Sequence, residues 1–498
     1  MFFFFILSGL FLGWSLGAND AANVYGTAVG TRMIKFRTAA TVCSIFLILG
    51  AVQGGAGAAH TLGKLGSVNQ LAGAFTVALA AAITVAWMTK LKLPVSTSQA
   101  IVGAIIGWNL FAGAQTDVGS LTKIVSSWVI CPLLSAVFAI LLFEVAEVGL
   151  RHLKVHLFHI DAWTRWGLFV VGAFASYSLG ANNIANVMGV FVNSTPFGPI
   201  SFYGLLTLSP AQQLFALGGV AIAVGVFTYS KKVMLTVGND LFRMSPIAAL
   251  VVVLAQAIVL FLFASEDLEA WLINHGLPSV PLVPVSSSQA VIGAVIGIGI
   301  AKGGRNIRFR VLGRIAVGWV TTPVISGFIG LVLLFIVQNV FSQHVHTPVP
   351  HLLDVEVVVK LKDKDLYSDA LEDLLGRRFE TAASLRRELA VRLPEDPRRG
   401  EILKYTEVAS LTVDIEKLAP LDDGQWFSEE QLRTVFRLHG RTYMHPWQLR
   451  DALAERSTEW RLLADTKRNK RFNKELKAKL DYLAQVFAAE PPKSPSSR

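Results

Sequence analysis

The first 340 residues alternate long apolar stretches with short polar connections. A helix needs about 20 apolar residues to cross the hydrocarbon core of a bilayer, and ten stretches approach that length. They lie at residues 2–30, 38–58, 71–89, 94–112, 124–143, 166–190, 211–230, 247–264, 284–301 and 313–340. Several contain Gly, Pro or polar runs, which predicts broken helices or re-entrant helical hairpins. We therefore expect an all-α membrane protein with about ten spans.

Three motifs of this membrane unit occur twice, in the same order. Residues 15–26 match residues 178–189, and residues 94–107 match residues 284–297. In the third match, Trp128, Pro132 and Ser135 are equivalent to Trp319, Pro323 and Ser326. An ordered set of matches indicates duplication of a five-span unit. Because five is odd, the second copy enters the membrane in the opposite orientation, which predicts an inverted-repeat transporter.

Basic residues gather in every second connection between these spans, whereas the loop at 192–210 carries no charge. Cytoplasmic loops are enriched in Lys and Arg, so ten crossings place all these clusters in the cytoplasm and both termini outside. A multi-pass protein of the plasma or inner membrane with an extracytoplasmic C-terminal domain is expected. The clusters comprise Arg32, Lys35, Arg37, Lys90, Lys92, Arg151, Lys154, Arg165, Lys231, Lys232, Lys302, Arg305, Arg308 and Arg310.

Charge density divides the chain into two parts. Residues 1–353 carry 27 charged side chains, whereas the 145 residues from 354 onward carry 53. The net charge of +10 belongs mostly to the membrane part. Basic residues in the loops between spans explain this positive charge. A nucleic-acid-binding protein would need a clustered basic face, so no nucleic-acid partner is expected. We predict repeat 1 at 1–143, a linker at 144–165, repeat 2 at 166–341, a linker at 342–353, a soluble domain at 354–490 and a disordered tail at 491–498.

The soluble C-terminal domain is expected to be small and of the α+β class. Val355–Leu361 and Val408–Ile415 are typical of strands. Leu371–Leu389, Glu429–Leu438 and Gln448–Phe487 carry helical patterns. No catalytic motif is visible in this domain.

Asp20 is the first acidic residue of the chain, and the next is Asp117. It lies in an apolar stretch beside Asn19 and Asn23. A charged side chain at that depth costs at least about 2.5 kcal/mol, so we expect it to face a polar cavity and a cationic partner. Amide oxygens suit a hard cation such as Na⁺, and a proton is the other candidate. A position at a helix end, close to water, is the alternative interpretation.

Pro94 and Pro284 precede the duplicated hydroxyl-rich runs. Pro starts or breaks a helix and leaves nearby N–H groups unpaired. Free N–H groups, hydroxyl donors and the positive end of a helix dipole together can bind an oxyanion. A hinge used for helix packing is the alternative, but two copies in inverted repeats favour a shared central site. The predicted anion-binding residues are Ser96, Thr97, Ser98, Gln99, Ser286, Ser287, Ser288 and Gln289.

Four other patterns favour a purely structural interpretation. Small-xxx-small glycine pairs at 103/107 and 293/297 indicate close helix packing. The histidines at 152, 156 and 159 share one face of a possible helix, where a solvated juxtamembrane segment is favoured over a metal site. The histidines at 344, 346 and 351 are interpreted in the same way. Cys43 and Cys131 lie in apolar stretches and indicate packing.

Together these motifs resemble the inorganic phosphate transporter (PiT) family of cation-coupled symporters. The motifs that carry the resemblance are Gly17-Ala-Asn-Asp-Ala-Ala-Asn23, Gly26-Thr-Ala-Val-Gly30, the repeat at Gly180–Asn186 and the two Pro-Val-Ser runs. The resemblance covers residues 1–340. It implies an inverted-repeat fold that imports inorganic phosphate by symport, with phosphate and cations bound near the centre. The family's cation signature maps to Asn19, Asp20, Asn23, Asn182 and Asn186.

Two departures from the family pattern concern the site. Asn183 replaces an Asp found in many relatives, and it completes the predicted cation site without a charge. Gln99 and Gln289 stand where many relatives carry His. The resemblance favours Na⁺ as the coupling ion, bound at the cation-binding residues, with H⁺ as the alternative. No cofactor is expected, and association into a homo-oligomer stays open.

Other functions remain as alternatives. Sulfate or another tetrahedral oxyanion could replace phosphate, because sulfate permeases occur among relatives of this fold. An anion channel, or a membrane sensor whose C-terminal domain reports the state of the membrane unit, is an alternative of another class. An enzyme is not expected, because no metal cluster or activated nucleophile lies in an apolar span.

Overall fold

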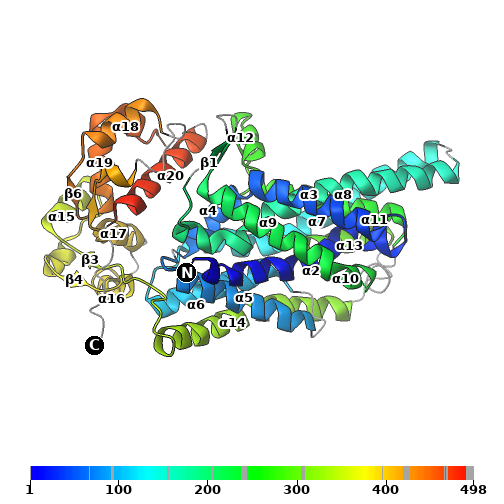
Figure 1. Cartoon of the computed structure of the whole chain (residues 1–498), viewed down its shortest axis with the longest axis horizontal. Helices are drawn as coiled ribbons and strands as arrows, with labels where there is room; N and C mark the ends of the chain where they lie inside the picture. Colours follow the sequence, from blue (N-terminus) through cyan, green and yellow to red (C-terminus); the bar gives the residue numbers. More distant parts are fainter. Residues whose placement is uncertain are drawn as a thin grey trace.

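The computed structural model describes residues 2–66, 68–90, 95–153, 156–198, 200–202, 206–236, 244–303, 309–394, 396, 398–418, 427–464, 466 and 469–488. Among the residues named above, Lys92, Pro94, Lys154, Arg305, Arg308 and the expected tail at 491–498 lie outside them. Figure 1 shows a bundle of long helices with a smaller C-terminal unit, coloured yellow to red, at one end.

The bundle is built almost entirely of helices. Its elements are α1 (Phe2–Phe5), α2 (Leu7–Gly30), α3 (Phe36–Gly54), α4 (Ala56–Leu65), α5 (Leu71–Lys90), α6 (Thr97–Ala112), α7 (Val118–Leu153), α8 (Leu157–Met188), η1 (Gly189–Ser194), β1 (Ile200–Phe202), β2 (Leu206–Leu208), α9 (Pro210–Thr228), α10 (Ser230–Thr236), α11 (Pro246–Ala264), α12 (Glu266–Asn274), α13 (Ser287–Ala301) and α14 (Phe309–Asn339). The antiparallel β1–β2 hairpin lies in the uncharged loop between α8 and α9.

Eight helices of the described chain are long and apolar enough to cross a membrane. The two other expected spans, at 94–112 and 284–301, become the shorter apolar helices α6 and α13. Both begin late because a serine ends an extended segment: Ser96 and Ser286 are the N-caps, and each hydroxyl accepts the N–H of the glutamine three residues on. The helices thus cover only part of the apolar stretches expected at 94–112 and 284–301.

The duplicated helices pack against each other reciprocally. α6 lies along α14, and α13 lies along α7 in the equivalent way. A Cβ built at Gly103 would lie 2.0 Å from the Pro323 carbonyl oxygen, and one at Gly293 would lie 2.1 Å from that of Pro132. Only glycine permits this approach of two backbones, so the predicted role of the glycine pairs in close packing is confirmed.

The expected linker between the repeats is mostly helical. α7 continues to Leu153 and α8 begins at Leu157, and helical turns of this region project beyond the bundle (Figure 1). His156 is the N-cap of α8, and its ring accepts the N–H of Phe158 at 3.4 Å. His152 belongs to α7. The three histidines therefore do not share one helix face, and that prediction was wrong.

The C-terminal unit contains short strands and helices around two small apolar cores. Its elements are β3 (His351–Leu352), α15 (Val355–Asp363), η3 (Asp369–Leu374), β4 (Arg378–Phe379), α16 (Ala382–Arg392), α17 (Arg399–Thr406), β5 (Leu411–Thr412), η4 (Ile415–Lys417), α18 (Glu429–Phe436), β6 (Thr442–Tyr443), α19 (Pro446–Arg456), η5 (Thr458–Trp460) and α20 (Lys470–Phe487). The unit begins with β3, inside the expected linker at 342–353. The helix expected at Glu429–Leu438 is α18.

The strand expected at Val355–Leu361 is helix α15 instead. The Asp354 carboxylate accepts the N–H of Val357 at 2.8 Å and caps the helix. Val357 and Leu361, four residues apart, are fully buried, whereas Val359 is 63% exposed. The apolar alternation suggested a strand, but the acidic cap and the burial of one helical face favour the helix.

Three other predictions for this unit were wrong in extent. Only residues 411–412 of the strand expected at Val408–Ile415 pair, in β5. The helix expected at Leu371–Leu389 starts only at α16, because Gly376 adopts φ +75° and β4 follows it. The pattern at Gln448–Phe487 divides into α19 and α20, with η5 between them.

The C-terminal unit contains an internal duplication that the sequence interpretation missed. Residues 376–392 match residues 440–456 with Gly-Arg at the start and Leu-Arg-x-x-Leu-Ala-x-Arg at the end. In each copy two distant two-residue strands pair antiparallel, and a capped helix follows the second of them: β3–β4 precedes α16, and β5–β6 precedes α19. Gly376 and Gly440 both adopt positive φ, +75° and +76°. The unit is therefore two copies of one supersecondary motif.

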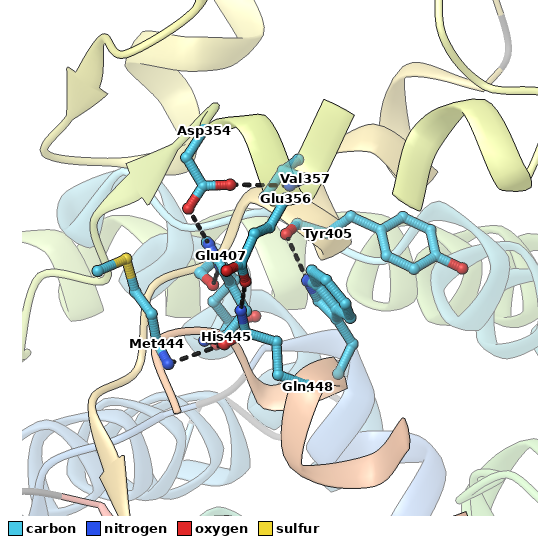
Figure 2. A network of polar contacts seen from close by, with 9 residues as sticks. Asp354, Glu356, Val357, Tyr405, Glu407, Met444, His445 and Gln448 are labelled. Atoms are coloured by element: carbon cyan, nitrogen blue, oxygen red, sulfur yellow. Dashed lines mark hydrogen bonds and ion pairs between the residues drawn. The ribbon is translucent and has the colours of Figure 1, made fainter. Parts of the chain in front are cut away.

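His445 joins the two copies (Figure 2). Its Nε2 lies 3.2 Å from a carboxylate oxygen of Asp354, and its Nδ1 lies 2.7 Å from the carbonyl oxygen of Glu407. Gln448, one turn into α19, donates to Glu356 of α15. The start of α19 is thus connected to the start of α15 by two side-chain contacts.

The segment after α14 ties the C-terminal unit to the bundle. The indole of Trp108 in α6 donates to the Val345 carbonyl at 2.9 Å, and the Asn69 amide donates to the Thr347 carbonyl at 2.8 Å. At the end of α6, the Gly113 carbonyl accepts the N–H of Ala383 at 3.2 Å. The C-terminal unit therefore rests on the end of α6 opposite the hydroxyl-rich run.

Candidate functional site

Asp20 lies in the middle of α2 and is 3% exposed. One carboxylate oxygen accepts the hydroxyl of Ser287 at 2.7 Å. The other accepts the Asn19 amide at 3.3 Å. A buried carboxylate needs such donors, because an unpaired charge in an apolar interior is costly. The structure thus brings the predicted cation-binding aspartate against the second hydroxyl-rich run.

α8 carries the equivalent asparagines of the second copy. Asn182, Asn183 and Asn186 are each at most 1% exposed. The Asn183 amide lies 3.5 Å from Asp20 Oδ2, and the Asn186 amide donates to Asn183 Oδ1 at 3.1 Å. Asn186 also donates to Ser98 Oγ at 2.8 Å. The side chains predicted from α2 and α8 therefore meet in one polar cluster.

The starts of α6 and α13 meet in a crossed arrangement. The Ser98 hydroxyl donates to the Val285 carbonyl at 3.1 Å, and the Ser288 hydroxyl donates to the Val95 carbonyl at 3.3 Å. Each run thus bonds to the extended segment that leads into the other. All eight residues of the two runs are buried. The two helix N-termini lie beside the Asp20 cluster.

Several buried polar atoms of this cluster have no hydrogen-bond partner among the residues that the structure describes. They are Asn23 Nδ2, Asn182 Oδ1, Asn186 Oδ1, Gln99 Oε1 and Gln289 Oε1. Native interiors rarely leave such atoms unpaired unless a ligand, an ion or water completes them. The amide oxygens and the Asp20 carboxylate form an oxygen donor set that suits a hard cation. The hydroxyls and helix N-termini suit an oxyanion.

Two kinds of group at the site were not identified from the sequence: backbone carbonyl oxygens and a cysteine sulfur. The carbonyl oxygens of Val95, Val283 and Val285 accept side-chain hydrogen bonds from the cluster, and residue type gives no signal for a backbone acceptor. Cys131 lies with its sulfur 3.8 Å from the Ser286 carbonyl, against the second run. Its place next to the duplicated Pro132 was the available signal. Among the described residues, no group of His, Cys, Asp and Glu could hold a metal ion.

A bundle of apolar helices around a buried polar centre defines a multi-pass membrane transporter. The chain belongs to the Phosphate transporter family, which it matches over residues 16–330 and 279–369. That membership makes it a transporter and not an enzyme, and it confirms the predicted resemblance. Most of the C-terminal unit lies beyond the matched residues.

The chain is also similar to three known proteins. The Pyrococcus furiosus protein named "Putative phosphate permease PF1020" is 27% identical over 410 residues, covering 66% of this chain and 96% of that protein. The Bacillus subtilis "Sulfate permease CysP" is 29% identical over 347 residues, covering 68% and 89%. A solved structure of "The sodium-dependent phosphate transporter" shares the fold with a TM-score of 0.54 at 22% identity, covering 68% and 98%.

Proposed function

We propose that the protein imports inorganic phosphate by symport with a cation, with Na⁺ favoured over H⁺. The observation that carries the proposal is the Ser287–Asp20 hydrogen bond. It joins a buried carboxylate, which suits a cation, to a helix N-terminus, which suits an oxyanion. Family membership supports phosphate as the anion.

The cation is held by Asp20 together with amide oxygens. Asn182 and Asn186 each present an unpartnered buried oxygen to this region. Asn19, Asn23 and Asn183 complete the proposed set. Carboxylate and amide oxygens are hard ligands that suit Na⁺, and the fold shared with a sodium-dependent transporter agrees with that preference.

Phosphate is held between the two hydroxyl-rich runs, Ser96–Gln99 and Ser286–Gln289. Hydroxyl side chains and the positive N-terminal ends of α6 and α13 lie at these runs and suit an oxyanion. A dianion beside the Asp20 carboxylate would be strongly repelled at low dielectric. The bound cation neutralises Asp20, so cation binding raises phosphate affinity. Coupling follows from this electrostatic requirement.

Transport proceeds by alternating access around this centre, in an inverted-repeat fold of ten crossings. Eight long helices supply eight of the crossings. α6 and α13, each preceded by an extended segment, supply the other two as broken spans. The reciprocal packing of α6 on α14 and of α13 on α7 supports the two-fold relation between the copies.

The C-terminal unit is proposed to lie outside the cytoplasm. The chain's N-terminus and the C-terminal unit lie at the same end of the bundle (Figure 1). α10, which carries Lys231 and Lys232, lies toward the opposite end. Because basic clusters mark the cytoplasmic side, the C-terminal unit falls on the other side.

Sulfate is the second candidate substrate, favoured by the similarity to the Bacillus subtilis sulfate permease. The two hydroxyl-rich runs would accept either tetrahedral anion. Sulfate keeps two charges at all working pH values, whereas phosphate titrates between one and two. Uptake that follows phosphate ionisation therefore separates the two substrates.

The test is uptake of radiolabelled phosphate into proteoliposomes, with and without an inward Na⁺ gradient and with sulfate as competitor. We expect uptake that rises with the Na⁺ gradient and resists excess sulfate. Uptake that follows a proton gradient instead would transfer the coupling role to H⁺. Loss of uptake to sulfate competition would overturn phosphate as the substrate.

A further inference from the structure

Within the described part of the chain, two tryptophans beside the anion-binding runs have buried indole N–H groups without a hydrogen-bond partner. They are Trp128 in α7 and Trp319 in α14, equivalent positions of the two copies. The amide oxygens of Gln99 and Gln289, also equivalent, are buried and unpartnered as well. An indole N–H can only donate, and an amide oxygen can only accept. The duplication therefore presents two unpaired donors and two unpaired acceptors.

The helix register places each donor at the level of one acceptor. In the first pair of helices, a Cβ at Gly103 would lie 2.0 Å from the Pro323 oxygen, and one at Gly107 would lie 2.6 Å from the Gly327 oxygen. From the first contact to the second, the position advances by four residues in α6 and by four residues in α14. The two helices therefore run parallel here. One turn earlier on the same two faces lie position 99 of α6 and position 319 of α14.

The second pair of helices repeats this register. A Cβ at Gly293 would lie 2.1 Å from the Pro132 oxygen, and one at Gly297 would lie 2.4 Å from the Ala136 oxygen. One turn earlier on α13 and α7 lie positions 289 and 128. Each glutamine of the anion site thus has a tryptophan of the neighbouring helix at its own level.

We propose that Trp319 and Trp128 are positioning residues that donate to the amide oxygens of Gln99 and Gln289 when the two hydroxyl-rich runs hold the anion. The inference rests on the proposed function of the two runs as an oxyanion site. The proposal identifies the groups that select the orientation of the two glutamine amides within that site.

The orientation matters because an amide has two unlike ends. If the oxygen of Gln99 faced the oxyanion, the two acceptors would repel each other. An indole donor satisfies that oxygen and leaves the amide N–H₂ group free to donate to the anion. Because Trp319 has no acceptor atom to offer, it disfavours the reversed amide. Each glutamine thereby becomes a fixed donor at the start of its helix.

Replacement of the indole by a ring without N–H tests the kinetic consequence. Trp319→Phe and Trp128→Phe should each raise the KM for anion uptake about 3- to 10-fold, the range expected for one lost hydrogen bond, with the maximal rate largely retained. Trp87→Phe, a 52% exposed tryptophan of α5, is the control and should leave the KM unchanged. An unchanged KM in both site variants would overturn the proposal.

The pairing itself is tested by the indole ¹⁵N–¹H signals of the full-length protein in detergent. Phosphate or sulfate, whichever the wild-type protein takes up, is added with Na⁺, and the signals of Trp128 and Trp319 are assigned from the two Phe variants. We expect both signals to move on anion binding. Gln99→Ala should abolish the response of Trp319 alone, and Gln289→Ala that of Trp128 alone. An intact response in both variants would overturn the pairing while the uptake of the wild-type protein still supports the proposed function.

Discussion

The hydroxyl of Ser287 donates a 2.7 Å hydrogen bond to Asp20, a residue 267 positions away in the chain. Ser287 is the first residue of α13 in the second copy, and Asp20 lies in α2 of the first. Two regions predicted separately, one for a cation and one for an anion, are therefore in direct contact. We propose this contact as the physical basis for coupling between the two ligands.

Loss of that hydroxyl should impair transport. Ser287→Ala leaves the buried Asp20 carboxylate with one donor fewer, and hydrogen bonds to charged groups are worth roughly 1.5–3 kcal/mol. We expect phosphate uptake to fall about 10-fold or more. Ser287→Thr is the matched control, since the equivalent position of the first copy is Thr97. Full activity in the Ala variant, or equal loss in the Thr variant, would contradict the role of the hydroxyl.

The close approach of α13 to α7 should be sensitive to a single methyl group. Gly293→Ala would place its Cβ 2.1 Å from a backbone carbonyl oxygen, so the helices must separate. Overpacking of this kind costs about 1–3 kcal/mol or more. We expect a lower melting temperature in detergent, measured by fluorescence-detected size-exclusion chromatography. Gly149→Ala in α7, where no described atom outside the helix's own backbone lies within 4 Å of the new Cβ, should not lower it. Equal melting temperatures for the two variants would contradict the packing account.

The C-terminal unit should lose stability in mild acid because of His351. This ring is 5% exposed, with Nδ1 3.0 Å from Thr406 Oγ1, and burial lowers the pKa of His351 to about 4. The pKa of an unfolded histidine is about 6.5. The unfolded state therefore binds more protons between pH 6.5 and 4, so the free energy of unfolding falls as pH falls through that window, by roughly 3 kcal/mol.

Hydrogen exchange of residues 351–406 in the full-length protein, corrected for the intrinsic rate at each pH, measures this loss. His351→Gln should flatten the decline between pH 6.5 and 4. His439→Gln, at an exposed position of the same unit, should leave it unchanged. A decline that persists in the His351 variant would assign the acid sensitivity to another group.

Much of the membrane unit could be predicted because its signals are repeated in the sequence. Duplicated motifs located Asp20, the asparagines of α8 and the two hydroxyl-rich runs, and the structure brings all of them into one cluster. The glycine at 103 likewise signalled a close helix contact. What could not be predicted was the crossed pattern of bonds to Val95 and Val285, because backbone acceptors leave no trace in residue type.

The C-terminal unit was predicted less well, for physical reasons. Its strands are only two residues long, which is too short for the alternation of apolar and polar side chains to be recognised in the sequence. The alternating Val355–Leu361 also fits the burial of one helical face, and the N-cap at Asp354 decides in favour of the helix. The duplication around Gly376 and Gly440 was visible in the sequence but was masked by divergent loops between its copies.

The central claim, that a cation neutralises Asp20 and so makes room for the anion, is tested most directly by equilibrium phosphate binding with and without Na⁺. Binding to the purified wild-type protein is compared with binding to Asp20→Asn, and Asp161→Asn, an exposed aspartate paired with Arg165, is the control. The account predicts that Na⁺ raises phosphate affinity in the wild-type protein and in the control, and that affinity in Asp20→Asn no longer depends on Na⁺. An undiminished Na⁺ effect in Asp20→Asn would contradict it.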